Sequence, residues 1–292
     1  MNLQILNDLR NQLKNLVVPD EIRKKINIAS PVLNSAGVDP WGLDPETLEA
    51  AAAIARWIYQ YYFRVEVTGL KNLPQGRLMV IANHGCQIPL DALFVSYAML
   101  LDAEPPKICR AMVDHWVPGL PFISELFTRC GEVVGAPHNC SDLLKNDNCV
   151  LIFPEGTKGS GKTIFSRYQL QNFGTGFMRI ALETKAPILP VAVVGTEEIY
   201  PSLMNLKPIA KLLKFPYFPV TPFFPHFGLA GAIPLPCKVT LRFAKPIHFD
   251  ESPDISEDKI HRLVSKVQLA IQNELNRGVK IRGNHIFTKA AI

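Results

Sequence analysis

The chain has 292 residues, of which 48% are hydrophobic and 20% charged, so it is long enough to bury a full core. Its formal net charge of +5 suits a surface drawn to anionic membranes or anionic substrates. The lysines and arginines are dispersed, however, so we expect no nucleic-acid partner. No stretch of about 18 uncharged apolar residues is present, and we therefore expect no spanning helix.

The six cysteines form no Cys-x-x-Cys pair, and no histidine stands at metal-ligand spacing from them. The N-terminal stretch MNLQILNDLRNQL lacks the apolar core of a signal peptide. These patterns predict reduced cysteines, no bound metal and a cytoplasmic location.

Two helices are predicted before the first strand. Apolar residues recur at helical spacing from residue 1 to about 28. A second helix is predicted over 45–63, where Arg56 is the only charged residue of the second half. That helix either packs against its own domain or lies in a membrane interface.

From residue 65 onward, apolar runs typical of strands alternate with helical patterns. The strands are predicted over 65–68, 78–82, 107–113, 132–134, 149–153, 187–195 and 239–243. Helices are predicted over 92–101, 120–130, 141–145 and 173–182, the third capped by Ser141, and a closing helix over 259–276 capped by Ser256.

This alternation predicts an α/β fold with a mostly parallel central sheet flanked by helices. We expect an N-terminal helical segment (1–62), an α/β domain (63–250) and a C-terminal helix with its tail (251–292).

The segment 208–236 combines many prolines with aromatic residues, which predicts a long loop or a broken hairpin. Its aromatic side chains either pack on the domain or form an apolar patch with a basic fringe that touches lipid. In the second case, replacing Phe223 and Phe224 with serine should release the protein from liposomes.

A histidine and an aspartate follow the buried run 78–82. His84 comes just after the carboxyl end of this strand, and Asp91 falls in the first turn of the next helix. A neutral imidazole can take a proton from an alcohol when a carboxylate on its other nitrogen fixes the tautomer. Alternatively, His84 caps the strand and Asp91 caps the helix. Cys86 is a weaker candidate for a nucleophile, because a side chain two residues away on a tight loop rarely reaches the histidine.

A second loop, after the strand 149–153, matches the P-loop pattern with Gly156, Gly161, Lys162 and Thr163. A P-loop enzyme also needs an apolar strand that ends in aspartate for magnesium, but the later strand ends in Gly195. A nucleotide site is therefore the weaker interpretation, and a plain glycine-rich surface loop remains open.

Four ordered stretches resemble the conserved blocks of the glycerolipid acyltransferase family, which includes lysophosphatidic-acid acyltransferases and a monoacylglycerol-acyltransferase-like branch. The resemblance covers roughly residues 63 to 250, and the block FPEGTK is its most specific part. The stretches are Asn83-His84 with Asp91, the block 153–158, the turn 173–181 and the strand 188–195.

The resemblance implies that His84 is the general base and Asp91 its orienting carboxylate, with direct attack of an acceptor hydroxyl on an acyl thioester. Asn83 would belong to the substrate site. The polar head of the acceptor would be lined by Glu155, Gly156, Thr157 and Lys158.

The expected partners are a membrane lipid acceptor and a thioester of coenzyme A or acyl carrier protein, with no other cofactor. The protein would sit peripherally on the cytoplasmic face of a membrane. The alternatives are a non-catalytic lipid-binding protein of the same fold and, less favoured, a P-loop nucleotide-binding protein.

The chain departs from the family pattern at two places. The usual spacing puts the aspartate four residues after the histidine, where this chain has Pro89; the longer spacing to Asp91 resembles the monoacylglycerol-acyltransferase-like branch. The second block, 131–137, lacks the arginine that binds phosphate, and His138 is a weak substitute. A neutral acceptor therefore stays open. Lys162 would be a flanking charge, so Lys162→Ala should keep most of the activity.

Overall fold

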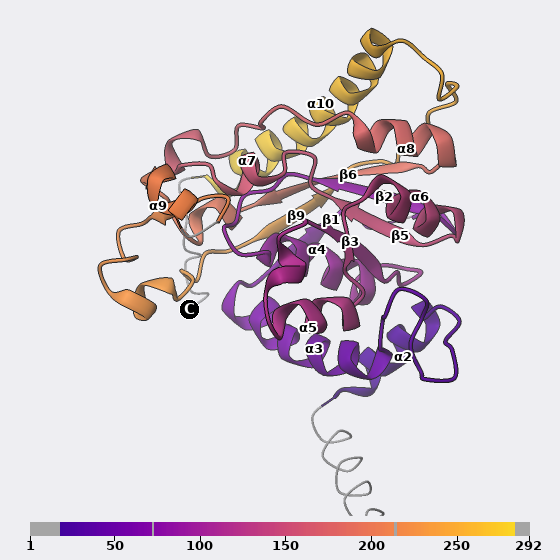
Figure 1. Cartoon of the computed structure of the whole chain (residues 1–292), viewed down its shortest axis with the longest axis horizontal. Helices are drawn as coiled ribbons and strands as arrows, with labels where there is room; N and C mark the ends of the chain where they lie inside the picture. Colours follow the sequence, from indigo (N-terminus) through magenta and orange to yellow (C-terminus); the bar gives the residue numbers. More distant parts are fainter. Residues whose placement is uncertain (1–17, 72, 213–214, 284–292) are drawn as a thin grey trace, which may run out of the picture.

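The computed structural model describes residues 18–71, 73–212 and 215–283. A seven-stranded sheet in the order β1-β9-β6-β2-β5-β3-β4 lies between two layers of helices (Figure 1). Its strands are β1 (Glu66–Thr68), β2 (Leu78–Ala82), β3 (Cys109–Val113), β4 (Val133–Val134), β5 (Cys149–Ile152), β6 (Ile188–Val194) and β9 (Thr240–Phe243).

The sheet is mostly parallel, as the alternation of strands and helices predicted. β2 lies in the middle and pairs in parallel with β5 on one side and β6 on the other, whereas β9 runs antiparallel to β6. Every residue of β2 and β6 is buried, which explains why both read as continuous apolar runs. Because β2, β5 and β6 are neighbours with the same direction, the loops at their carboxyl ends meet at one edge of the sheet.

Helices cover both faces of the sheet. One face carries α3 (Pro45–Trp57), a π-helical turn (Ile58–Tyr62) and α4 (Leu90–Leu101), which pack on alternate residues of β2 and β6. The other face carries α6 (Pro137–Lys145), α8 (Gly176–Thr184) and α10 (Glu257–Arg282). Residues before position 62 and after position 250 thus pack in the same core as the residues between them. The division of the chain at positions 62 and 250 stays a prediction.

Several predicted helix ends differ from the structure. α6 begins at Pro137 rather than at a Ser141 cap, because a proline at the first helical position is preorganised for the helix. Ser141 lies inside α6 and its hydroxyl donates to Glu183 at 3.1 Å. α10 begins directly after Ser256 and extends to Arg282, beyond the predicted end at 276.

At the N-terminus, one helix was predicted over residues 1 to about 28, and its part over 1–17 lies outside the described residues. In the described part, α2 (Asp20–Ala29) begins only after Pro19. The predicted helix 120–130 is shorter, as α5 (Ile123–Arg129) preceded by a 3₁₀ turn, η2 (Val117–Gly119).

A buried ion pair joins the N-terminal segment to the sheet. Arg110 on β3 is 1% exposed and its guanidinium donates to Asp39. Asp39 also accepts the backbone N–H groups of Trp41 at 2.9 Å and Leu43 at 2.7 Å. Asp39 therefore shapes its own turn and neutralises the one cation inside β3 at the same time.

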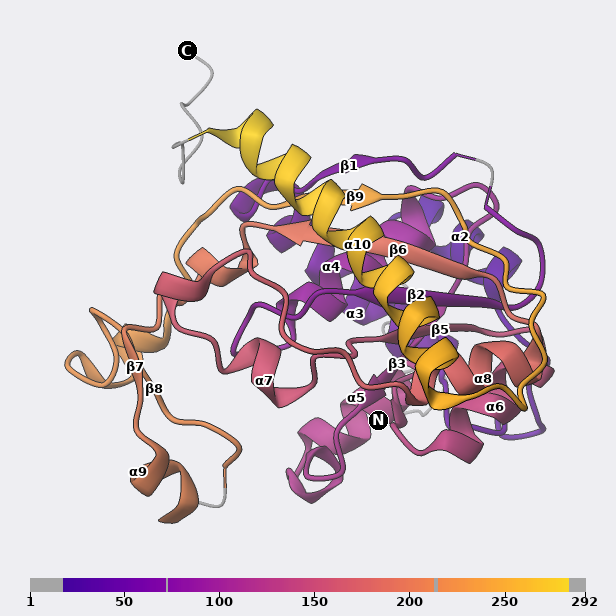
Figure 2. The same cartoon turned by 90° about the horizontal axis from the view of Figure 1, so that it is seen from above.

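The segment 208–236, predicted as a long loop or a broken hairpin, contains one strand of a short hairpin together with short helical turns. β7 (Met204–Asn205) and β8 (Pro219–Val220) pair antiparallel and enclose α9 (Lys207–Leu212); a 3₁₀ turn, η5 (Gly228–Ala232), follows. Figure 2 shows this extension, with α7 (Thr157–Ser160) beside it, on the side toward which β6 points. Among the described residues, no helix combines the length and the apolar character that crossing a bilayer requires.

Candidate functional site

The imidazole of His84 and the carboxylate of Asp91 meet where β2 ends and α4 begins. His84 Nδ1 lies 2.5 Å from Asp91 Oδ2, and the side chains are 19% and 0% exposed. Pro89, at the N-cap of α4, turns the chain so that Asp91 faces back toward the histidine loop. The longer spacing from histidine to aspartate therefore still gives a direct hydrogen bond, within the range of about 3.2 Å.

The backbone holds Asp91 in this position. Its Oδ2 accepts the N–H groups of Gly85 at 3.1 Å and Cys86 at 3.4 Å. Oδ1 accepts the N–H of Ala92 at 3.0 Å. Because Asp91 occupies Nδ1, the other ring nitrogen, Nε2, is the one left for a substrate hydroxyl.

The charges around His84 raise its pKa. Burial alone would lower the pKa, but the carboxylates of Asp91 and Glu155 outweigh burial and the opposing charge of Lys162. Phe153 stacks against the ring, with centroids 4.7 Å apart. A raised pKa makes the neutral imidazole a stronger base, and it also requires a higher pH to produce that neutral form.

Cys86 does not have the properties of a nucleophile. It is fully buried. Burial and the nearby charge of Asp91 raise the pKa of its thiol, so the thiol stays protonated at neutral pH.

Asn83 links β2 to β6. Its side chain is buried, its amide nitrogen donates to Val193 O at 3.0 Å, and its amide oxygen accepts Val193 N–H at 2.7 Å. These bonds continue the pairing of the two strands past Ala82 and fix where the His84 loop begins. The predicted contact of Asn83 with substrate is untested and stays a prediction.

The FPEGTK block divides into a buried part and an exposed part. Glu155 is 4% exposed, and its two oxygens accept the N–H groups of His84 at 3.0 Å and Gln171 at 2.8 Å. Gly156, Thr157 and Lys158 are exposed at the start of α7. All four stay predictions as substrate contacts. In the structure, Glu155 holds the backbone of two loops through hydrogen bonds, whereas the other three residues face solvent.

α7 lies directly against the histidine. A Cβ atom added at Gly159 would come within 2.8 Å of the His84 carbonyl oxygen and 2.9 Å of its Cβ. Only a glycine allows this approach, which brings the exposed start of α7 next to the imidazole.

The expectation that Lys162 is a flanking charge is wrong, because its side chain is buried and paired. Its side chain is 4% exposed, and Nζ lies 2.6 Å from Glu197 Oε1 and 3.3 Å from Glu155 Oε2. The ammonium thus faces two carboxylates instead of a phosphate, which argues against the P-loop interpretation. Glu197 was not singled out by the sequence. The one available signal was its position just after the buried strand β6, next to the carboxyl ends of β2 and β5.

The segment 208–236 touches the histidine loop. Tyr217, just before β8, donates its hydroxyl hydrogen to Gln87 O at 2.6 Å. Trp116, ahead of η2, contacts Phe215 edge to face with ring centroids 6.3 Å apart. Trp116 and Phe215 are both exposed apolar residues, so two distant segments of the chain meet in an apolar contact at the surface.

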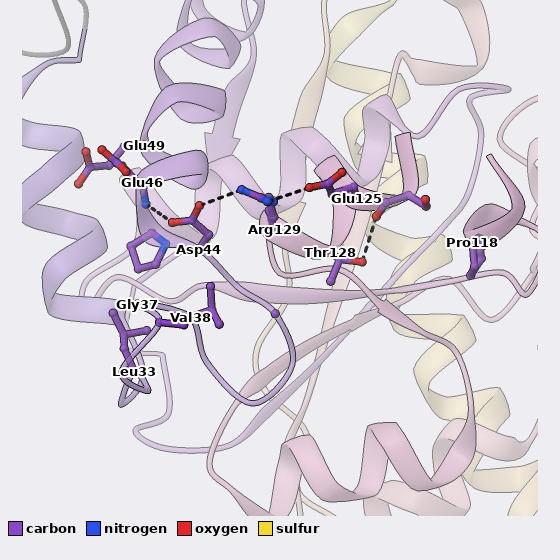
Figure 3. A pocket seen from close by; sticks show the side chains of 14 residues that line it. Leu33, Gly37, Val38, Asp44, Glu46, Glu49, Pro118, Glu125, Thr128 and Arg129 are labelled. Carbon is purple, nitrogen blue, oxygen red and sulfur yellow. Dashed lines mark hydrogen bonds and ion pairs between the residues drawn. The ribbon is translucent and has the colours of Figure 1, made fainter. Parts of the chain in front are cut away.

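A further pocket lies elsewhere on the protein. It measures about 940 Å³ and lies between the segment 33–49 and α5, where Arg129 pairs with Glu125 at 2.8 Å and Asp44 at 3.7 Å (Figure 3). His84, Asp91 and the FPEGTK block do not line it. The hydrogen-bonded His84–Asp91 pair therefore remains the candidate site for chemistry. Within the described residues, no group of His, Cys, Asp and Glu is placed to hold a metal ion.

Comparison with known proteins shows the following similarities. A family model described as "Acyltransferase" matches residues 64–194. The chain is 39% identical over 256 residues to the uncharacterized protein ML2427 of Mycobacterium leprae, which covers 86% of this chain and 70% of that protein. It is 26% identical over 220 residues to the "DGAT1/2-independent enzyme synthesizing storage lipids" of Mus musculus, covering 75% of this chain and 62% of that protein.

Among solved structures, the chain resembles the 1-acyl-sn-glycerophosphate (LPA) acyltransferase PlsC from Thermotoga maritima. The TM-score is 0.52 at 18% identity, and the match covers 97% of this chain and 99% of that chain. At this identity the match establishes the shared fold.

Proposed function

Because the chain belongs to the glycerolipid acyltransferase family, we propose that it transfers a fatty acyl chain from a thioester to a hydroxyl of a glycerolipid, with His84 as general base. The observation that carries the proposal is the 2.5 Å contact between His84 Nδ1 and Asp91 Oδ2. This contact fixes the tautomer in which Nε2 has a free lone pair for the acceptor hydroxyl.

The proposed step balances without an acyl-enzyme intermediate. Nε2 takes the proton of the acceptor hydroxyl as its oxygen attacks the thioester carbonyl. A C–O bond forms, the C–S bond breaks, and the imidazolium returns the proton to the leaving thiolate. The buried carboxylate of Asp91 stabilises the imidazolium between these two transfers.

The exposed start of α7 is the proposed place for the acceptor's polar head. Gly156, Thr157 and Lys158 are exposed, and α7 contacts His84 through Gly159. Lys158 suits a phosphate, and the threonine hydroxyl suits glycerol. Two similar proteins, an enzyme synthesizing storage lipids and an LPA acyltransferase, support a glycerolipid acceptor, either neutral or phosphorylated.

The experiment is acyl transfer by the purified protein from radiolabelled acyl-coenzyme A and from acyl carrier protein thioester. Lysophosphatidate, glycerol 3-phosphate, monoacylglycerol and diacylglycerol are offered separately in vesicles or detergent. We expect one acceptor class to be labelled. Labelling of none, with stoichiometric binding of a lipid, would instead support the alternative of a non-catalytic lipid-binding protein.

We further propose that the 208–236 extension docks peripherally on the membrane from which the acceptor comes. Leu212, Phe223 and Phe227 are 81%, 43% and 66% exposed. Lys207 and Lys211 on α9 supply positive charge for anionic lipid. Tyr217 connects this extension to the His84 loop, so docking there would bring the site to the bilayer surface.

Replacing Phe223 and Phe227 with serine is expected to reduce co-flotation with phosphatidylglycerol-containing vesicles, because both side chains leave water on docking. We choose Phe227 for this test instead of Phe224, because Phe224 packs against Phe218 with ring centroids 5.7 Å apart. The matched control is Leu269→Ser on α10, where the leucine is 61% exposed. Equal flotation of the double variant and the control would assign docking to another surface.

A further inference from the structure

We infer that Lys162 is a positioning residue: its buried ammonium holds Glu155 and Glu197 together behind the His84–Gly85 backbone and so maintains the catalytic loop. The expected effect of Lys162 on catalysis rests on the proposed function. Its structural part stands on contacts among the loops that follow β5 and β6.

The ammonium lies between two carboxylates. Nζ is 2.6 Å from Glu197 Oε1, 3.3 Å from Glu155 Oε2 and 3.3 Å from the backbone oxygen of Gln169. The side chains of Lys162, Glu155 and Glu197 are 4%, 0% and 4% exposed. Buried ions require such pairing, because a charge removed from water without a partner is strongly unfavourable.

Each carboxylate supports the histidine loop. Glu155 accepts the N–H of His84 at 3.0 Å through Oε1. Glu197 packs on Gly85 so closely that an added Cβ there would lie 2.4 Å from Glu197 Cγ. Its Oε2 accepts the N–H of Tyr168, which ties the loop after α7 to the same cluster. Lys162 contacts both of these carboxylates and so links the two supports of the histidine loop.

The same charges act on the imidazole. The titratable groups around His84 are Asp91 from α4, Glu155 and Lys162, with the protonated thiol of Cys86 beside Asp91. Burial lowers the pKa of His84, Asp91 and Glu155 raise it, and Lys162 lowers it. Burial raises the pKa of Glu197 even with Lys162 present. Loss of the positive charge of Lys162 removes an influence that lowers the pKa of His84, so we expect that pKa to rise.

The test compares Lys162→Met and Lys162→Arg with the wild type and with Lys266→Met, which removes an exposed lysine of α10. We expect Lys162→Met to lower kcat by on the order of tenfold to a hundredfold, as misplacement of a catalytic group does, with a smaller change in KM. Lys162→Arg is expected to restore part of kcat because it restores the charge. NMR titration of the imidazole, assigned with His84→Ala, should give a higher pKa in Lys162→Met.

The double variant Lys162→Met/Glu197→Gln removes one charge of each sign and keeps the experiment decisive where the single variant does not fold. We expect this double variant to fold. Its His84 should have a higher pKa than His84 of the wild type, and its kcat should be lower than that of the wild type. A folded Lys162→Met or double variant with the wild-type pKa of His84 and the wild-type kcat overturns the inference. The NMR titration needs no turnover, so it decides the role of Lys162 even if the wild type acylates no acceptor, a result that would instead refute the proposed function.

Discussion

His84→Ala is expected to lower kcat for acyl transfer by on the order of 10² to 10⁴-fold, the usual contribution of a general base. The imidazole is hydrogen-bonded to a fully buried carboxylate and has one ring nitrogen left for substrate. Alanine removes the proton acceptor, while the polar contacts proposed for the substrate at α7 are unchanged. The decrease should therefore appear in kcat more than in KM.

The control for this variant is His115→Ala, since His115 is exposed ahead of η2. Thermal unfolding of both variants should show folded proteins. A His84→Ala protein that is folded and retains more than a tenth of wild-type kcat would remove His84 from the chemistry.

The pH dependence of kcat/KM of the wild-type protein should reflect the protonation of His84. Only the neutral imidazole accepts the proton, and the pKa of His84 is raised above its ordinary value of 6.5. We therefore expect kcat/KM to increase as pH rises through that raised pKa and to fall at lower pH. The contribution of His84 to the free energy of unfolding changes with pH in the opposite direction. The folded state stabilises the protonated imidazole, so this contribution is fully present below pH 6.5 and is lost as pH rises through the folded-state pKa.

Asp39→Asn is expected to lower the free energy of unfolding by about 3 to 5 kcal/mol, because it leaves the guanidinium of Arg110 buried without its counter-charge. Arg110 is 1% exposed, and burial lowers its pKa in spite of Asp39. The amide oxygen of asparagine can still accept the backbone N–H groups of the turn. The loss should therefore reflect the ion pair rather than the turn, and urea unfolding measures it.

Two comparisons test this explanation. The double variant Asp39→Asn/Arg110→Met should recover most of the loss, since no charge then stays buried. Asp20→Asn removes a fully exposed carboxylate 3.6 Å from Arg23 and should lower the free energy of unfolding far less than Asp39→Asn does, because exposed ion pairs are screened by water. If the Asp39 and Asp20 variants unfold at the same urea concentration, the buried pair is not what joins the N-terminal segment to β3.

The amino-acid sequence by itself determined where the strands of the main sheet lie along the chain and that His84 and Asp91 are close to each other. Apolar runs such as 78–82 and 188–194 are read locally, since a strand buried on both faces must be apolar throughout. His84 and Asp91 are seven residues apart on one turn between a strand and a helix, so chain connectivity already brings them close. Local capping rules were less reliable, as at Ser141, where a proline four residues earlier starts the helix.

Only the tertiary structure decided the environment of that pair. Glu155 reaches the His84 backbone across 71 residues of sequence, Lys162 reaches Glu197 across 35, and Arg110 reaches Asp39 across 71. A charged residue in a loop is typical of a solvated surface, and nothing in its neighbours along the chain indicates that it will be buried. The partner that makes burial of Lys162 favourable comes from the loop after another strand, and the order β5-β2-β6, which sets which loops meet, results from the packing of the whole sheet.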